Sequence, residues 1–199
     1  MRITGTWADG RVLHLRELTL GDYVFWAECK RDWPKDRRGF YTLQRAIADV
    51  DRNVRDNARV VVPLGPDVRW IQTLIAYTDN APIGLARHRA AGTSCHVLQQ
   101  AIHPDQRGGG WFSRMNELLS RYAFDLLGAD VVTHELLPDD SAAGARTYVS
   151  NRQQYGSLGE TTGETGKRLQ AGRMRRADFE AWAAMPRNAA KLPFMEFQP

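Results

Sequence analysis

The residues whose types and spacing best fit a chemical task lie in a short basic turn with three glycines. Arg107 is followed by Gly108, Gly109 and Gly110, and an amphipathic helix is expected directly after them. Glycines let the main chain approach an anion closely, and the free N–H groups at a helix start carry partial positive charge. Arg107 adds a fixed cation. The turn therefore predicts a diphosphate site, although such glycines also suit a plain strand-to-helix turn.

This turn needs a strand before it and a helix after it. Residues 95–103 predict the strand, and apolar residues keep a helical period from Trp111 to Leu127. Gly128 ends the helix, and residues 130–137 supply the next strand. We therefore expect strand, turn, helix and strand in this order.

The rest of the chain reads as one domain over residues 1–185 with a tail at 186–199. Further strands are expected at 12–16 on a sheet edge, at 70–78 and 83–90 as a hairpin, and at 167–176 as the terminal strand. Further helices are expected after Thr19, at 43–54, 141–153 and 177–185, and residues 156–166 predict a loop. The first helix is expected to have one apolar face formed by Leu20, Tyr23, Val24 and Ala27, and the second by Leu43, Ala46, Ile47, Val50 and Val54.

Composition limits the classes of partner. The net charge of +4 and the pI near 9.3 weakly favour anionic partners, and both coenzyme A and nucleic acid qualify. Cys29 and Cys95 are too few for a disulfide framework or a cysteine-based zinc site, so no metal is expected. No stretch approaches the ~20 apolar residues that span a bilayer. We expect a soluble cytoplasmic protein without a membrane partner.

The passage at 101–130 resembles the acyl-CoA-binding motif of the GNAT superfamily, Arg/Gln-x-x-Gly-x-Gly/Ala, with the match at Arg107 to Gly110. The segments APIGLARHR (81–89) and RYAFDLLGAD (121–130) also fall in family order. RRADFEAW (175–182) resembles the ending of the branch that acetylates ribosomal-protein N-termini. The resemblance implies an α+β fold of the GNAT type, with a mixed, mostly antiparallel sheet of about six to seven strands and helices on both faces.

The last position of the motif departs from the family pattern. It is Phe112 in the register that starts at Arg107 and Trp111 in the register that starts at Gln106, where the family has Gly or Ala. Three interpretations stay open: coenzyme A in an altered pose, a different acyl or aminoacyl donor, and loss of donor binding.

The resemblance also implies how the donor, acetyl-CoA or another acyl-CoA, is held. The strands at 95–103 and 130–137 would splay apart around the pantetheine arm. Main chain near Ala101 to His103 would polarise the thioester carbonyl, as an oxyanion hole does. The implied donor contacts are Ala101, Ile102, His103, Arg107, Gly108, Gly109, Gly110, Trp111, Phe112 and Asp140.

An amine that attacks the thioester directly needs a base for its proton and an acid for the departing thiolate. Glu135 is the first candidate base, because it lies on the strand after the long helix. His134 points to the opposite face of that strand, and His96 and His103 are further options. Tyr148 is the candidate acid, because family members often place a tyrosine on the following helix.

The acceptor is expected to bear an amine, on a protein N-terminus, a small molecule or a modified base. Gln99 and Gln100 are unusual neighbours in a central strand, because buried amides need partners, and one of them is expected to face the acceptor. Residues 30–41 and 156–166 should set acceptor identity, since loops vary independently of the fold. We expect a monomer or a homodimer.

Two alternative functions use the same scaffold. Trp33 lies among basic and aromatic residues at 30–41, a composition that can bind phosphates and stack bases. This favours a nucleic-acid binder or a base-modifying transferase, unless the segment is a solvated loop. The second alternative is a non-catalytic protein that has kept the scaffold.

Overall fold

The computed structural model describes residues 1–31, 41–57, 63–79, 81–136, 158–162 and 168–199. The described strands form one nine-stranded sheet in the order β7-β8-β6-β5-β4-β3-β2-β1-β9. They are β1 (Arg2–Thr6), β2 (Val12–Glu17), β3 (Arg69–Thr78), β4 (Ala81–Ala91), β5 (Ser94–Ile102), β6 (Val131–Leu136), β7 (Leu158–Thr162), β8 (Arg168–Arg175) and β9 (Phe194–Gln198). The described helices are η1 (Leu20–Asp22), α1 (Tyr23–Lys30), α2 (Leu43–Asp56), η2 (Pro104–Gln106), α3 (Trp111–Arg121), η3 (Tyr122–Leu126), α5 (Arg176–Ala184) and α6 (Pro186–Ala189).

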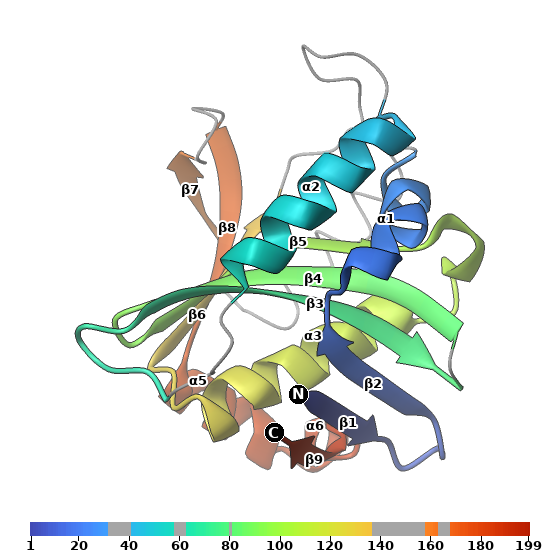
Figure 1. Cartoon of the computed structure of the whole chain (residues 1–199). Helices are drawn as coiled ribbons and strands as arrows, with labels where there is room; N and C mark the ends of the chain where they lie inside the picture. The colour runs from blue at the N-terminus through green and yellow to red at the C-terminus, as the bar shows by residue number, and fades with distance from the viewer. Residues whose placement is uncertain (32–40, 58–62, 80, 137–157, 163–167) are drawn as a thin grey trace.

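Helices cover both faces of this sheet (Figure 1). The pair α1 and α2 packs on one face, where Trp26 and Ala46 share a buried cluster with Leu85 and Ala101. The long helix α3 packs on the other face, where Met115 belongs to a second cluster. In the described sheet only β5 and β6 pair in parallel, and the other neighbouring strands pair antiparallel. The predicted α+β class and the mostly antiparallel sheet are thus confirmed.

The parallel pair β5 and β6 is joined over only part of its length. Pairing runs from Ser94 with Val131 to Val97 with His134 and then stops, while β5 continues to Ile102. On its other edge β5 stays paired with β4 as far as Ile102. The two strands therefore separate in the middle of the sheet, which is what the resemblance implied for the segments 95–103 and 130–137.

A β-bulge lies where this separation begins. Arg87 of β4 pairs with Gln99, whereas the next residue, His88, pairs with Val97, so Leu98 is the extra residue of β5. A bulge shifts the alternation of side chains between the two faces. Accordingly Ala101 packs under α1 and α2, and Val97 packs in the cluster on the opposite face.

The helix predicted at 111–127 is present, with a change of helical type near its end. Its α-helical part is α3, and the π-helical turn η3 follows at Tyr122. Gly128 has φ of 72°, a left-handed conformation that suits glycine and ends the helix. The helix predicted at 141–153 lies outside the described residues.

The faces predicted for α1 and α2 are partly wrong. Leu20 and Val24, expected on an apolar face, are 59% and 46% exposed, whereas Phe25, Trp26 and Cys29 of α1 are buried. Thr19 caps the 3-10 turn η1 instead of the α-helix, and this extra turn rotates the face that α1 presents to the sheet. In α2, Ala46 and Val50 are buried as expected, but Leu43 and Ile47 are 50% and 48% exposed.

The sheet is larger than expected because three strands were not predicted. β1 pairs with β2, so the segment at 12–16 is not a sheet edge. β7 occupies part of the predicted loop at 156–166, and β9 pairs with β1, so β8 is not the terminal strand. The segment at 186–199, expected as a tail, carries α6 and β9. None of the helices in the described part of the chain has the length and apolar character needed to span a bilayer.

Candidate functional site

The glycine turn before α3 has the conformation and space that an anion site requires. Gly108 and Gly110 have φ of 87° and 77°, which L side chains rarely adopt. A Cβ added at either would meet nothing within 4 Å, so the main chain is open on that side. Arg11 donates a hydrogen bond through Nη1 to the carbonyl of Gly109 at 2.9 Å. The turn is thus held from β2's side of the molecule while its outer surface stays accessible.

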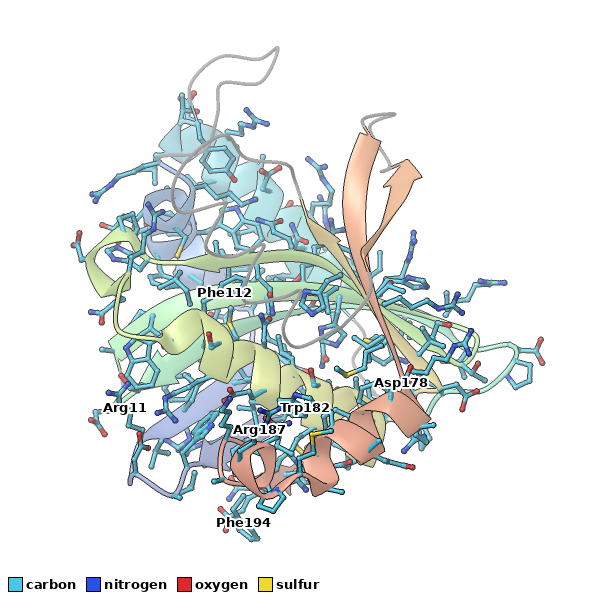
Figure 2. The ribbon with its side chains drawn as sticks, turned by 180° about the vertical axis from the view of Figure 1, so that it is seen from behind. Arg11, Phe112, Asp178, Trp182, Arg187 and Phe194 are labelled. Atoms are coloured by element: carbon cyan, nitrogen blue, oxygen red, sulfur yellow. The ribbon has the colours of Figure 1, made fainter. Side chains whose placement is uncertain are left out.

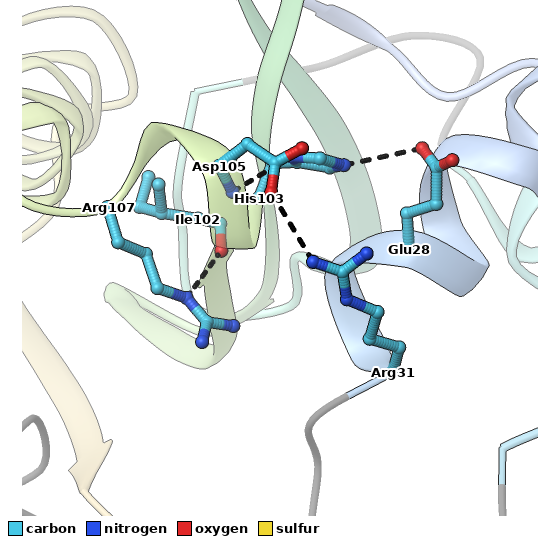
Figure 3. Close-up of polar contacts among 6 residues, drawn as sticks. All are labelled: Glu28, Arg31, Ile102, His103, Asp105 and Arg107. Carbon is cyan, nitrogen blue, oxygen red and sulfur yellow. Dashed lines mark hydrogen bonds and ion pairs between the residues drawn. The ribbon is translucent and has the colours of Figure 1, made fainter.

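The strand end that leads into the turn is tied to α1 (Figure 3). His103 stacks on Phe25, with ring centroids 5.7 Å apart, and its Nε2 lies 3.3 Å from Glu28 Oε2. Arg31 forms an ion pair with Asp105 at 3.4 Å. These contacts fix the loop between β5 and α3 in place. The His103 ring is engaged with α1, which makes it a poor choice for the general base.

The main chain at the end of β5 can bind a ligand on its β6 side, and this is where the resemblance implies contacts with the thioester. Beyond Val97, no described strand pairs with β5 on the β6 side. Towards β4, the His103 amide donates to the Ile83 carbonyl at 2.8 Å. Arg107 Nε donates to the Ile102 carbonyl at 3.3 Å, which brings its guanidinium beside the strand end. Ala101, Ile102, His103 and Arg107 are thus brought together, next to Gly108.

The aromatic residues at the last motif position pack inward. Trp111 and Phe112 are partly buried and lie against the cluster that includes Met115 and Leu118. Figure 2 shows Phe112 at the start of α3. The Arg11 guanidinium lies 5.7 Å from the centroid of the Trp111 ring. Their bulk therefore contributes to the packing of the start of α3.

The candidate bases on and near β6 differ in accessibility. His134 is 3% exposed, and burial lowers the pKa of its imidazole to about 3, so it is neutral and shielded from solvent. His96 is bonded to Thr133 Oγ1 through Nδ1 at 2.7 Å, and burial together with Arg89 lowers its pKa. The backbone of Glu135 pairs with Ala171 at the open end of β6. Its side chain, and all of Tyr148, Asp140 and Trp33, lie outside the described residues.

The two glutamines of β5 face opposite sides of the sheet. Gln99 lies two residues before Ala101 and therefore faces α1 and α2, whereas Gln100 faces α3 with Ile102. Both amide nitrogens are buried without a hydrogen-bond partner among the described residues. The bulge at Leu98 determines which face each glutamine points to, and no pattern in the sequence indicates this bulge.

A cationic cluster on the α1 and α2 face was missed by the sequence analysis. Lys30 is buried with Nζ 4.1 Å from the ring centroid of Trp26. Tyr41 accepts a hydrogen bond from Trp26 Nε1 and donates one to Asp49 Oδ2, each at 2.6 Å. Arg87 of β4 lies close enough for its charge to act on Lys30. The basic and aromatic composition of residues 30–41 did indicate part of the cluster, but not its contacts with the sheet.

Two cavities lie away from the place where β5 and β6 separate, and the first of them borders the glycine turn at Gly110. One of about 320 Å³ is lined by Trp7, Arg11, Gly110 and Arg114 among others, on the side of α3 that faces the β1–β2 turn. The other, of about 740 Å³, lies between Asp56, Arg69 and Arg89. Among the described residues, none of β6 and none from Leu98 to Ile102 lines either cavity.

The stretch at 175–182 that resembles the ribosomal-protein branch has a packing role. It covers the end of β8 and most of α5. Phe179 stacks on Phe124 with ring centroids 4.6 Å apart, and on Trp182 at 6.2 Å. The contact with Phe124 holds α5 against η3.

Comparisons with known proteins identify the fold. No protein-family model and no curated protein matches the sequence. A chimeric spermidine N-acetyltransferase from Vibrio cholerae has a TM-score of 0.62 at 13% identity, over 84% of this chain and 98% of that chain. A GNAT-family acetyltransferase from Bacillus anthracis has a TM-score of 0.62 at 12% identity, over 89% and 99%. A dodecameric spermidine N-acetyltransferase from Vibrio cholerae has a TM-score of 0.58 at 13% identity, over 88% and 97%. Together with the strands that separate beside a glycine turn, these similarities show that the chain has the fold of the GNAT acetyltransferases.

Proposed function

We propose that this chain is an N-acyltransferase that moves an acetyl or other acyl group from acyl-CoA to an amine. The observation that carries the proposal is the separation of β5 from β6 directly beside the glycine turn. A donor with a diphosphate and an extended arm fits this arrangement, since the turn offers main-chain N–H groups and the strand end offers an unpaired edge. The fold similarity to acetyltransferases supports the same reading.

Each part of the site has a proposed task. Gly108 to Phe112 and Arg107 bind the diphosphate, and main chain at Ala101 to His103 polarises the thioester carbonyl. The donor supplies an activated acyl group. The amine nitrogen bonds to the carbonyl carbon as the carbon–sulfur bond breaks. Glu135 takes the amine proton, and the thiolate receives a proton from Tyr148, with Asp140 as a further donor contact.

The acceptor is proposed to be an amine, and the similarity in fold to spermidine N-acetyltransferases supports a small one. Acetylation of ribosomal-protein N-termini remains a proposal on the sequence resemblance alone. Trp33 and one of the two glutamines, Gln99 or Gln100, are the proposed acceptor contacts.

Donor binding is the direct test. At one hundred times its dissociation constant, acetyl-CoA should stabilise the folded state by about 2.7 kcal/mol, or roughly 5–10 °C in melting temperature for a domain of this size. Calorimetric titration should show Arg107→Ala weakening the affinity about tenfold, because a charge-assisted contact is lost. Arg69→Ala, at the start of β3, is the matched control and should bind like wild type. A chain that no acyl-CoA stabilises would refute the proposal, and binding without transfer to any amine would favour the non-catalytic alternative.

A further inference from the structure

Two side chains on the α1 and α2 face meet where β5 leaves β6. Arg87 and Gln99 are register partners across β4 and β5, next to the bulge at Leu98. Leu85 and Ala101 follow two residues farther along the same strands and pack under α1 and α2. Side chains two apart on a strand share a face, so Arg87 and Gln99 point to this same side.

Both side chains hold hydrogen-bond donors that have no partner in the part of the chain that the structure describes. Arg87 Nε and Gln99 Nε2 are buried, and neither is bonded to any described residue. A buried donor without an acceptor is unfavourable, so such atoms in a native site indicate a bound group. An amide can present either its nitrogen or its oxygen, but a guanidinium can only donate. Arg87 therefore requires a ligand with oxygen acceptors.

The charge around these donors is positive. Lys30 is buried, and its pKa is lowered to about 8 by burial, by Arg87 and by Arg45, while Asp49 opposes the shift. Asp49 already accepts a hydrogen bond from Tyr41 and lies 3.3 Å from Arg52 Nη2. Lys30, Arg45 and Arg87 thus bring three positive charges close together on this face. An anionic group bound to Arg87 would be attracted by these charges, whereas a cationic group at the same place would be repelled.

We infer that the acceptor is an amine that also carries a phosphate or a carboxylate, and that Arg87 and Gln99 bind this anionic group. The inference rests on the proposed function, because the amine must reach a thioester held near Ala101. Arg87 pairs with Gln99, which lies two residues before Ala101 on β5. Two residues of a strand span about 7 Å, so this is roughly the separation of the two positions. An acceptor whose amine and anionic group lie about that far apart fits both positions. Such an acceptor carries a negative charge on its second group, whereas spermidine, the substrate of the spermidine N-acetyltransferases of similar fold, carries a positive one.

Anion binding tests the inference without any turnover. Inorganic phosphate is titrated calorimetrically into the protein saturated with coenzyme A, so that the glycine turn is filled. Saturable binding is expected, and Arg87→Met should weaken it about tenfold or more because a charge-assisted hydrogen bond is lost. Arg55→Met removes an exposed arginine of α2, paired with Asp51, and should leave the affinity unchanged. Absence of saturable binding, or equal weakening by both substitutions, overturns the inference.

The preference for different acceptors gives a second readout, and it distinguishes a phosphate from a carboxylate as the anionic group. With acetyl-CoA as donor, kcat/KM is compared for phosphoethanolamine against ethanolamine, for β-alanine against β-alaninamide, and for spermidine. At least one anionic member should exceed its uncharged counterpart about tenfold or more, and Arg87→Met should bring that ratio close to one. Gln99→Met removes a donor without removing charge and serves if Arg87→Met does not fold. Preference for spermidine or for an uncharged amine overturns the inference while leaving the acyltransferase proposal intact, whereas failure to bind acyl-CoA refutes that proposal separately.

Discussion

The buried imidazole of His88 should make the protein lose stability in mild acid. His88 lies on β4 and is 2% exposed. Its ring lies between Trp70 and Tyr122, with centroids 5.3 Å and 5.7 Å away in edge-to-face arrangements. Neither ring nitrogen has a hydrogen-bond partner among the described residues. Burial lowers the pKa of His88 to about 3, because a charge in this apolar setting is unfavourable.

The size of the effect follows from proton linkage. The folded pKa lies below the unfolded value of 6.5, so between these values the unfolded chain binds a proton that the folded chain does not. Stability is therefore full above pH 6.5 and declines as the pH falls towards the folded pKa. At pH 5 the loss is about 2 kcal/mol, and it hardly depends on the exact folded pKa as long as that lies well below 5.

Urea unfolding of wild type and His88→Phe at pH 8 and pH 5 measures this contribution. At pH 8 His88 is neutral in both states, so the difference between the proteins there reports packing alone. Between pH 8 and pH 5 the variant should lose about 2 kcal/mol less than wild type, while losses from other groups, including His134, cancel in the comparison. Equal losses in both proteins would show that His88 is not a buried neutral group and would refute the reasoning.

Two further substitutions test the elements that support the candidate site, the turn before α1 and the strand β4. Asp22→Asn removes the carboxylate that binds Arg16 at 2.6 Å and closes the capping box with Thr19, so we expect a loss of about 1–3 kcal/mol at pH 7 by chemical unfolding. Burial raises the pKa of Asp22, but the hydrogen bonds from Arg16 and Thr19 outweigh burial, so the pKa is lowered overall. The stability lost on substitution should therefore shrink as the pH falls below 3.8. A loss of stability that is independent of pH would contradict this role of the carboxylate. Gly84→Ala would place a Cβ 2.6 Å from the Ala101 carbonyl oxygen, and we expect it to push β4 from β5, cost about 1–3 kcal/mol and weaken acetyl-CoA binding; unchanged melting temperature and affinity would contradict this close approach.

Regular periodicity explains which elements could be predicted. The apolar face of the helix at 111–127 repeats over several turns, so local pattern alone defined α3 and η3. The helix α1 has only eight residues after a 3-10 turn, and its true buried face could not be distinguished from the neighbouring one. β1 and β9 are five residues each and pair with each other from opposite ends of the chain. Short strands whose partner is distant in sequence give little local signal.

The same distinction separates the donor side of the site from the acceptor side. The glycine turn and its flanking strand and helix are continuous in sequence. The residue types from Ala101 to Phe112 therefore predict a diphosphate site without knowledge of the fold. The proposed acceptor side combines Lys30 from α1, Arg45 from α2, Arg87 from β4 and Gln99 from β5. Only the packing of α1 and α2 over the sheet, and the bulge that rotates Gln99 to that face, bring these side chains together. On the proposed function, acceptor specificity depends on contacts of this kind, so two chains with equally clear glycine turns could accept amines whose second groups carry opposite charges.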